Sequence, residues 1–196
     1  MAPKYYDVII KQGLDGLHCY ANDFDIGENG YWVWMFAASK LLEMVDTLFI
    51  VLRKRPLVFM HWYHHIVTFI YAWYSHPSSP SFNHTGIYWN YTVHSVMYSY
   101  YLLRSMKFNL PGWCAKFVTT FQIMQFVLGV LTVFHGYVLF YVQKKNCDLT
   151  PDVLHFAFFM EFTFLLLFIN FFHKSYILKG GKEKYKNLSN GEKKVN

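Results

Sequence analysis

Three histidines lie within one pentad, His61-Trp62-Tyr63-His64-His65, inside a segment that is otherwise strongly apolar. Residues at positions i, i+3 and i+4 share one face of a helix, so the three imidazoles are expected to lie together. Polar rings at bilayer depth usually mark a functional site. The pattern suggests two chemistries: ligation of iron in a lipid oxidase, or nucleophilic attack by imidazole on an acyl thioester.

Other apolar segments carry polar residues at a similar depth. Counted from the cytosolic end of each predicted helix, Glu43, His64, His94 and Gln125 lie roughly 12–15 Å below the surface at about 1.5 Å per residue. Four polar side chains from four segments at one depth predict an internal chamber.

Lys40, Glu43 and Asp46 recur every three residues and so share a helix face. An unpaired charge at mid-bilayer costs about 2.5–3.5 kcal/mol, so these residues should face other helices. Two interpretations stay open. They form an ion-pair network that fixes packing, or the carboxylates hold a ring N–H of a pentad histidine. Asn90 and His94 begin a similar polar stripe in residues 90–101.

The elements that position these residues are predicted to be membrane-spanning helices. Of the 196 residues, 54% are hydrophobic, 21% aromatic and only 15% charged, which excludes an ordinary soluble domain. Five segments are long enough to cross a core of about 30 Å: residues 31–52, 57–75, 86–104, 117–141 and 153–174. We predict an all-α membrane protein with about five transmembrane helices. Its expected parts are a lumenal lead-in (1–30), a transmembrane domain (31–175) and a cytosolic lysine-rich tail (176–196).

Basic residues indicate the topology, because Lys and Arg favour cytosolic connections. The connections after the first and third spans carry Arg53, Lys54, Arg55 and Arg104. The net charge of +6 is therefore a topology signal, and no nucleic-acid recognition motif is present. Lys193 and Lys194, near the carboxyl end, resemble the dilysine retrieval signal of endoplasmic-reticulum membrane proteins.

The three cysteines bear on both chemistry and stability. Cys19 and Cys147 fall on the predicted lumenal side, where disulfides form, but spacing alone leaves a bridge and free thiols both open. Cys114 lies at the cytosolic edge, so no cysteine reaches the depth of the pentad. A di-iron oxidase needs several histidine boxes, whereas this chain has one box and one further well-placed histidine. Imidazole is therefore the favoured acyl acceptor.

Four segments, in order along the chain, resemble the ELO family of very-long-chain fatty-acid elongases. They are KLLEMVDT at 40–47, HWYHH at 61–65, the segment at 90–101 and TTFQIMQ at 119–125. The RKRPLVF stretch before the pentad is similar to that of members acting on saturated and monounsaturated chains. The resemblance implies a seven-helix fold, a helical barrel around an acyl tunnel. Two spans that precede the first predicted helix are expected to be missing, which would breach the tunnel wall.

The resemblance further implies an acyltransferase, a multi-pass protein of the endoplasmic-reticulum membrane with a cytosolic carboxyl end. As a 3-oxoacyl-CoA synthase it would condense a long-chain acyl-CoA with malonyl-CoA, releasing CO₂ and CoA, with neither a redox cofactor nor a metal. Implied partners are the 3-oxoacyl reductase, dehydratase and enoyl reductase of the elongation cycle, and a homo- or hetero-oligomer stays open. The alternatives are a di-iron desaturase or hydroxylase and a non-catalytic truncated subunit.

Matching the family's motifs assigns roles to individual residues. His64 is implied as the nucleophile that forms an acyl-imidazole, with His94 as its partner, while His61 and His65 shape the site or assist malonyl decarboxylation. The expected supporting residues are Glu43, Asp46, Asn90 and Gln125. The resemblance also implies a disulfide between Cys19 and Cys147. From charge and side alone, the residues expected to hold CoA phosphates are Lys40, Arg53, Lys54, Arg55 and Arg104.

Overall fold

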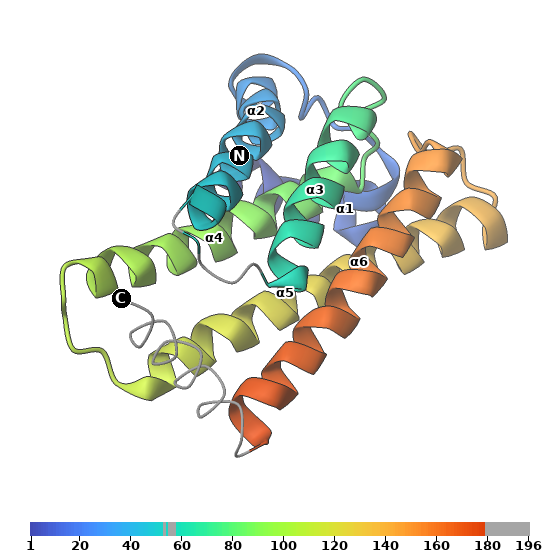
Figure 1. The fold of residues 1–196 in the computed structure, drawn as a ribbon. Helices are drawn as coiled ribbons and strands as arrows, with labels where there is room; N and C mark the ends of the chain where they lie inside the picture. Colours follow the sequence, from blue (N-terminus) through green and yellow to red (C-terminus); the bar gives the residue numbers. More distant parts are fainter. Residues whose placement is uncertain (53, 55–57, 179–196) are drawn as a thin grey trace.

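The computed structural model describes residues 1–52, 54 and 58–178, apart from the side chains of Asp46 and Ile50. These residues form six α-helices and, within the described part, no strand, which confirms the predicted all-α class (Figure 1). The helices are α1 (Ala2–Cys19), α2 (Gly27–Leu52), α3 (Phe59–Ser75), α4 (Asn83–Ser105), α5 (Gly112–Tyr137) and α6 (Pro151–Phe172). Short π-helical turns, η1 (Val138–Val142) and η2 (His173–Ile177), extend α5 and α6.

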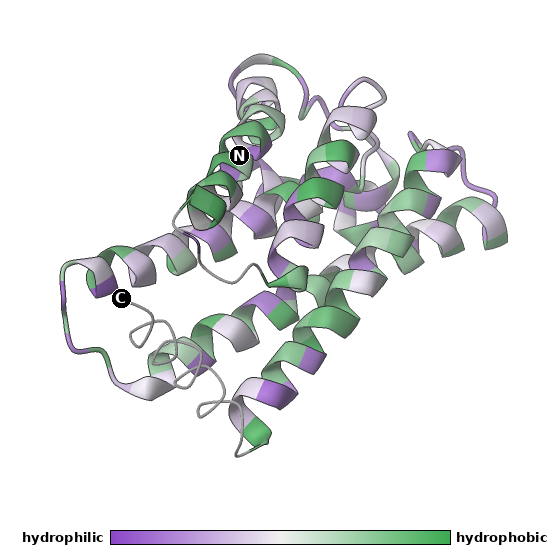
Figure 2. Ribbon diagram, in the orientation of Figure 1, coloured by the Kyte–Doolittle hydropathy of each residue, from purple (hydrophilic) through white to green (hydrophobic). Residues whose placement is uncertain are grey.

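Helices α2 to α6 coincide with the five predicted spans, with ends that differ by a few residues. Two stretches, Gly112–Val142 and Pro151–Ile177, are long and apolar enough to cross a membrane by length and composition. Hydropathy alternates along the other helices, where polar turns interrupt apolar ones (Figure 2). Of the residues expected in the chamber, Glu43, His64 and His94 lie on these other helices, whereas Gln125 lies on α5.

Helix α1 lies in the segment 1–30, whose structure the sequence left uncertain. It is bent at Gly13, whose φ of 69° is a left-handed value that glycine adopts without strain. One face of the helix is buried, with Tyr5, Val8 and Leu17 packed against Phe24. The bend interrupts the helical period, so the apolar spacing of this segment does not stand out in the sequence.

The main core lies between α3, α5 and α6. Phe126, Val133, Leu154, Phe164 and Phe168 are among its buried members. In Figure 1, α5 and α6 run side by side, and the structure packs α6 against α3 as well. This aromatic core fixes the face of α3 that carries the histidine pentad.

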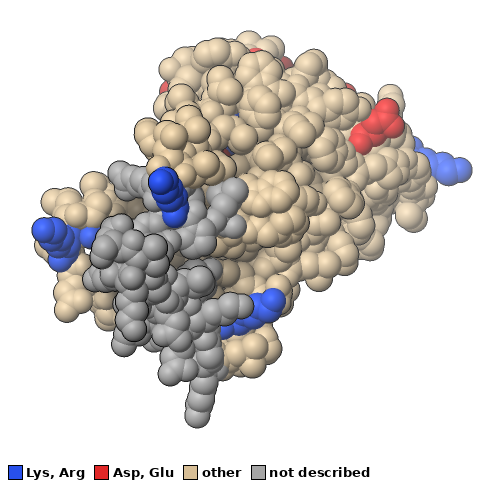
Figure 3. Space-filling model, in the orientation of Figure 1, with Lys and Arg blue, Asp and Glu red and all other residues tan. Residues whose placement is uncertain are grey.

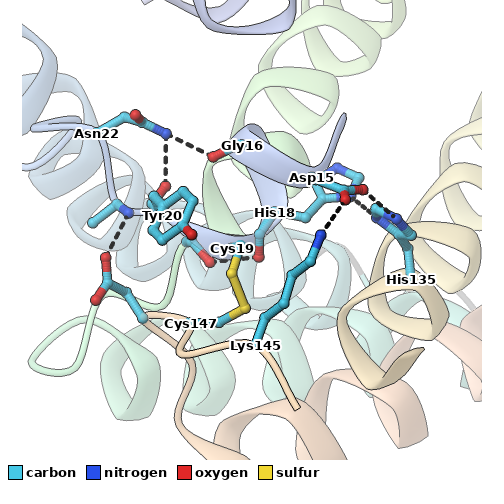
Figure 4. The surroundings of a disulfide bond; sticks show 12 residues. Asp15, Gly16, His18, Cys19, Tyr20, Asn22, His135, Lys145 and Cys147 are labelled. Atoms are coloured by element: carbon cyan, nitrogen blue, oxygen red, sulfur yellow. Dashed lines mark hydrogen bonds and ion pairs between the residues drawn. A yellow bond between two sulfur atoms is a disulfide. The ribbon is translucent and has the colours of Figure 1, made fainter. Parts of the chain in front are cut away.

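Several contacts join one end of the bundle, which we call the disulfide end (Figure 4). Cys19, at the end of α1, is bonded to Cys147, the pairing that the family resemblance implies. Beside it, the Asp148 amide donates to the Cys19 carbonyl at 2.7 Å, and the Ser81 hydroxyl donates to the His18 carbonyl at 2.6 Å. Three segments distant in sequence are therefore held together at this end.

We expect Cys19→Ser to lower the free energy of unfolding. The disulfide joins residues 128 positions apart. A cross-link that closes so long a loop lowers the conformational entropy of the unfolded chain and so stabilises the fold by up to about 5 kcal/mol. Thermal unfolding with and without reductant measures the effect. Cys114→Ser, which removes the free thiol, is the control and should leave the midpoint unchanged. Equal midpoints for wild type and Cys19→Ser would show that the bridge contributes nothing.

A small ionic cluster lies next to the disulfide (Figure 4). Asp15 pairs with Lys145 at 2.6 Å and with His135 at 3.1 Å, and the Nδ1 atoms of His18 and His135 are 2.9 Å apart. The hydrogen bond from Lys145 is the first of the contacts that hold the pKa of Asp15 below its ordinary value. Burial, and then the neighbouring His135, lower the pKa of His18 to about 4.

The depressed pKa of His18 predicts that acid weakens this end of the fold. Below about pH 6.5 the unfolded chain takes up a proton that the folded chain accepts only near pH 4, so stability falls across that window. The free energy of unfolding should fall by at most about 3 kcal/mol through this group. Thermal midpoints between pH 7 and 5 should decline for wild type and decline less for His18→Gln. His155→Gln, at an exposed histidine, should decline like wild type. A wild-type midpoint that does not change with pH would contradict the prediction.

Candidate functional site

A buried lysine–carboxylate pair on α2 lies against residues of α3 and α4. Lys40 and Glu43 lie one turn apart on α2, and the Lys40 ammonium donates to Glu43 Oε1 at 2.6 Å and to Asn90 Oδ1 at 2.9 Å. Lys40 is only 2% exposed. Its charge is therefore compensated by two oxygens from two helices, as a buried charge requires.

The same carboxylate faces histidines of two other helices. Glu43 Oε2 lies 3.5 Å from Nδ1 of His65 on α3, and Glu43 Oε1 lies 3.9 Å from Nδ1 of His94 on α4. One carboxylate that contacts a ring nitrogen in each of two helices can fix both tautomers and both ring orientations. Both interpretations of this motif stay open, because Glu43 pairs closely with Lys40 and also lies near a pentad histidine.

The pentad divides into a pair and a separate ring. His61 and His65, one turn apart on α3, have ring centroids 4.4 Å apart. His64 instead faces the aromatic core, 4.7 Å from the ring of Phe164 and 6.1 Å from that of Phe168. All three imidazoles nevertheless line one cavity, as the helical spacing predicts.

Two cavities meet at His64. The wider one, about 720 Å³, is lined by the three pentad histidines and by His94, and it extends along α4 and α5 to Tyr176. The narrower one, about 80 Å³, runs from His64 between α3, α4, α5 and α6 toward the disulfide end. Their shared lining residues are His64, Asn90, Gln125 and Phe126. His64 is therefore exposed to both a roomy and a narrow compartment.

Polar residues of two helices face the wider cavity. Asn90, His94, Tyr98 and Tyr101 line it from α4, and Thr119, Gln122 and Gln125 line it from α5. Tyr176 closes the far end, with its hydroxyl 3.2 Å from Thr119 Oγ1. Tyr176 could not be predicted from the sequence, because no polar spacing singles it out at the end of the last span.

The structure corrects the role expected for Lys40. We expected this residue among the groups that hold CoA phosphates at the cytosolic mouth, but its ammonium is buried and bonded to Glu43 and Asn90. Of the other candidates, Lys54 and Arg104 are exposed. Figure 3 shows basic side chains around the end of the molecule where α4 ends and α5 begins. Arg53, Arg55, Lys193, Lys194 and the side chain of Asp46 lie outside the described residues.

A di-iron centre was the other chemistry that the pentad suggested. The part of the chain that the structure describes contains no group of three His, Cys, Asp or Glu side chains placed to hold a metal ion. The described residues therefore do not fit an iron pair, which needs several such ligands.

Comparison with known proteins gives a consistent result. A family model described as ELO, the GNS1/SUR4 family, matches residues 1–184. The chain is 54% identical over 186 residues to Long chain fatty acid elongase 1 of Caenorhabditis elegans, covering 95% of this chain and 65% of that protein. It is 40% identical over 153 residues to Very long chain fatty acid elongase 6 of Drosophila melanogaster, covering 78% of this chain and 48% of that protein.

A human protein, Very long chain fatty acid elongase 3, is 33% identical over 179 residues, covering 91% of this chain and 66% of that protein. The chain thus spans between about half and two thirds of the length of these curated relatives. No solved structure is significantly similar to it.

Proposed function

We propose a function from one premise: the chain belongs to the GNS1/SUR4 (ELO) family, by a match that covers residues 1–184. It is a fatty-acid elongase that condenses a long-chain acyl-CoA with malonyl-CoA to give a 3-oxoacyl-CoA, CO₂ and CoA. The observation that carries this proposal is the position of His64 at the junction of two cavities. The narrow cavity suits an acyl chain, and the wide one admits the larger CoA groups.

The first step is acyl transfer to His64. A ring nitrogen attacks the thioester carbonyl, the C–S bond breaks, and CoA leaves as a thiolate that is neutralised by the proton of the other ring nitrogen. The product is a neutral acyl-imidazole with its chain in the narrow cavity. No cysteine lines either cavity among the described residues, so imidazole is the acyl acceptor that the site provides.

The second step consumes malonyl-CoA in the wide cavity. Loss of CO₂ leaves an enolate at the malonyl C2, which attacks the acyl-imidazole carbonyl. The C–N bond to His64 breaks, the imidazole recovers a proton, and the chain is longer by two carbons. His94 lines this cavity and contacts Glu43, so it is placed to assist at the incoming nucleophile. His61 and His65 shape the same compartment. Neither step needs a redox cofactor.

Glu43 and Lys40 are positioning residues in this mechanism. Glu43 orients His65 and His94 through their Nδ1 atoms, and Lys40 holds Glu43 and Asn90 in place. Their partners come from α2, α3 and α4, so the pair fixes the relative position of three helices that line the site. Such supporting contacts typically change activity by about 10–100-fold when removed.

The proposed setting is the endoplasmic-reticulum membrane. Helices α2 to α6 cross it, the disulfide end faces the lumen, and the carboxyl end is cytosolic. The bridge between Cys19 and Cys147 supports this orientation, because the lumen permits disulfides. Arg104 and Lys54 then lie on the cytosolic side, where CoA is bound, and the other enzymes of the elongation cycle are the expected partners.

An elongation assay tests the proposal. The purified chain in lipid nanodiscs is incubated with a long-chain acyl-CoA and ¹³C-labelled malonyl-CoA, and the products are analysed by mass spectrometry. We expect a 3-oxoacyl-CoA that is two labelled carbons longer than the donor. No labelled product would overturn the proposal, and association of an inactive chain with a full-length elongase would identify it as a non-catalytic subunit.

A further inference from the structure

The narrow cavity contains polar atoms that the proposed reaction does not use. Glu161 lines it from α6, Thr68 from α3 and Thr85 from α4. Glu161 Oε2 and the Thr68 hydroxyl oxygen are buried and have no hydrogen-bond partner among the described residues. Each such atom costs about 1–3 kcal/mol when left unsatisfied. A channel for a plain hydrocarbon chain gains nothing from them.

The Glu161 carboxyl group occupies space that a glycine on the facing helix leaves open. A Cβ atom on Gly129 of α5 would overlap the Glu161 carboxyl group, so the acid lies directly against the α5 backbone. Glycine is the residue that leaves this space open. The acid therefore lies between α6 and α5, in space that the glycine leaves open.

The acid lies a short way beyond His64. Thr68 follows His64 by four residues, and Glu161 precedes Phe164, whose ring contacts His64, by three. Both lie about 4.5–6 Å further along the channel at about 1.5 Å per residue. An extended hydrocarbon chain advances about 1.3 Å per bond, by analogy with the polypeptide backbone, where the three bonds between consecutive Cα atoms span about 3.8 Å. Chain atoms at roughly carbons 4 to 6 would thus pass Glu161.

We infer that Glu161 selects acyl-CoA donors whose chain carries a hydroxyl group at this position, roughly carbon 5. A hydroxyl both donates and accepts, so it can bond a buried oxygen such as Glu161 Oε2. A cis double bond offers only a weak π acceptor, and a saturated chain offers none. This inference rests on the proposed elongase function and names the donor class that its acyl cavity prefers.

A competition assay tests the inference. Equal amounts of 5-hydroxyoctadecanoyl-CoA, octadecanoyl-CoA and cis-5-octadecenoyl-CoA are offered with malonyl-CoA to the full chain in nanodiscs, and the three products are quantified. We expect wild type to prefer the hydroxylated donor over the saturated one by roughly tenfold. Glu161→Leu should abolish or reverse that preference. Glu161→Gln, which keeps a hydrogen-bonding group of equal size, should retain part of it and covers the case in which the leucine variant does not fold.

Two further variants separate position from charge. Gly129→Ala keeps the acid but displaces it, so the preference should also fall. Glu28→Gln makes the same chemical change at an exposed position and should keep the wild-type ratio.

Three outcomes would overturn the inference. Equal use of the three donors, or a preference for the unsaturated donor, would contradict the selection of a hydroxylated chain but leave the elongase function intact. A Glu161→Leu variant that keeps the wild-type selectivity would show that Glu161 is not responsible for it. If no donor at all is elongated, the proposed function fails, and the inference falls with it.

Discussion

Replacing His64 with alanine should lower the elongation rate by roughly 10³-fold or more, because the variant lacks the group that accepts the acyl chain. The loss should appear in kcat as well as in kcat/KM, since no other described side chain lines both cavities with comparable nucleophilicity. Initial rates of two-carbon extension with a saturating long-chain acyl-CoA measure the effect.

A histidine outside the cavities provides the matched control. His155, on α6, is exposed, and its Nδ1 is 2.6 Å from the Pro151 carbonyl oxygen. His155→Ala should keep elongation within a few-fold of wild type. Thermal midpoints of both variants exclude unfolding as the cause. His64→Ala with at least a tenth of wild-type activity would contradict the assignment of this residue as the nucleophile.

The second large effect is expected at the buried pair of Lys40 and Glu43. Glu43→Leu leaves the Lys40 ammonium buried with only Asn90 as an acceptor, which should destabilise the fold by about 3–5 kcal/mol. Activity should also fall, because the rings of His65 and His94 lose their common carboxylate. Thermal unfolding and initial rates, measured on the same preparations, give the two quantities.

A double variant separates stability from function. Lys40→Met combined with Glu43→Leu removes both charges, so most of the lost stability should return, since apolar replacement of a whole buried pair is often neutral. Elongation should stay at least tenfold below wild type, because the histidines remain without their carboxylate. Recovery of activity together with stability would show that the pair serves packing alone.

The sequence predicts best the helices that form long apolar segments. Helices α5 and α6 lie in stretches long and apolar enough to cross a membrane, and α3 is recognised by the apolar residues around the pentad. Helix α1 was not predicted because its bend at Gly13 breaks the period, and because its partners, Phe24 and Tyr88, lie elsewhere in the chain. Its place depends on tertiary contacts that no local pattern encodes.

Some residues of the candidate site could also be predicted from the sequence, and others could not. Helical spacing predicts that His64, His94 and Gln125 meet, because depth along each span follows from counting residues. The expectation for Lys40 was wrong because charge indicates an end of the molecule, whereas position 40 lies more than two turns inside α2. Glu161 was missed because its significance depends on Gly129 of another helix.

The most direct test of the account is the intact mass of the protein after incubation with an acyl-CoA alone, without malonyl-CoA. Acyl transfer to imidazole predicts a mass increase equal to the acyl group, located by peptide mapping to His64, absent in His64→Ala and discharged when malonyl-CoA is added. An acyl group that maps to another residue, or turnover without any adduct under conditions that trap acyl-imidazoles, would contradict it.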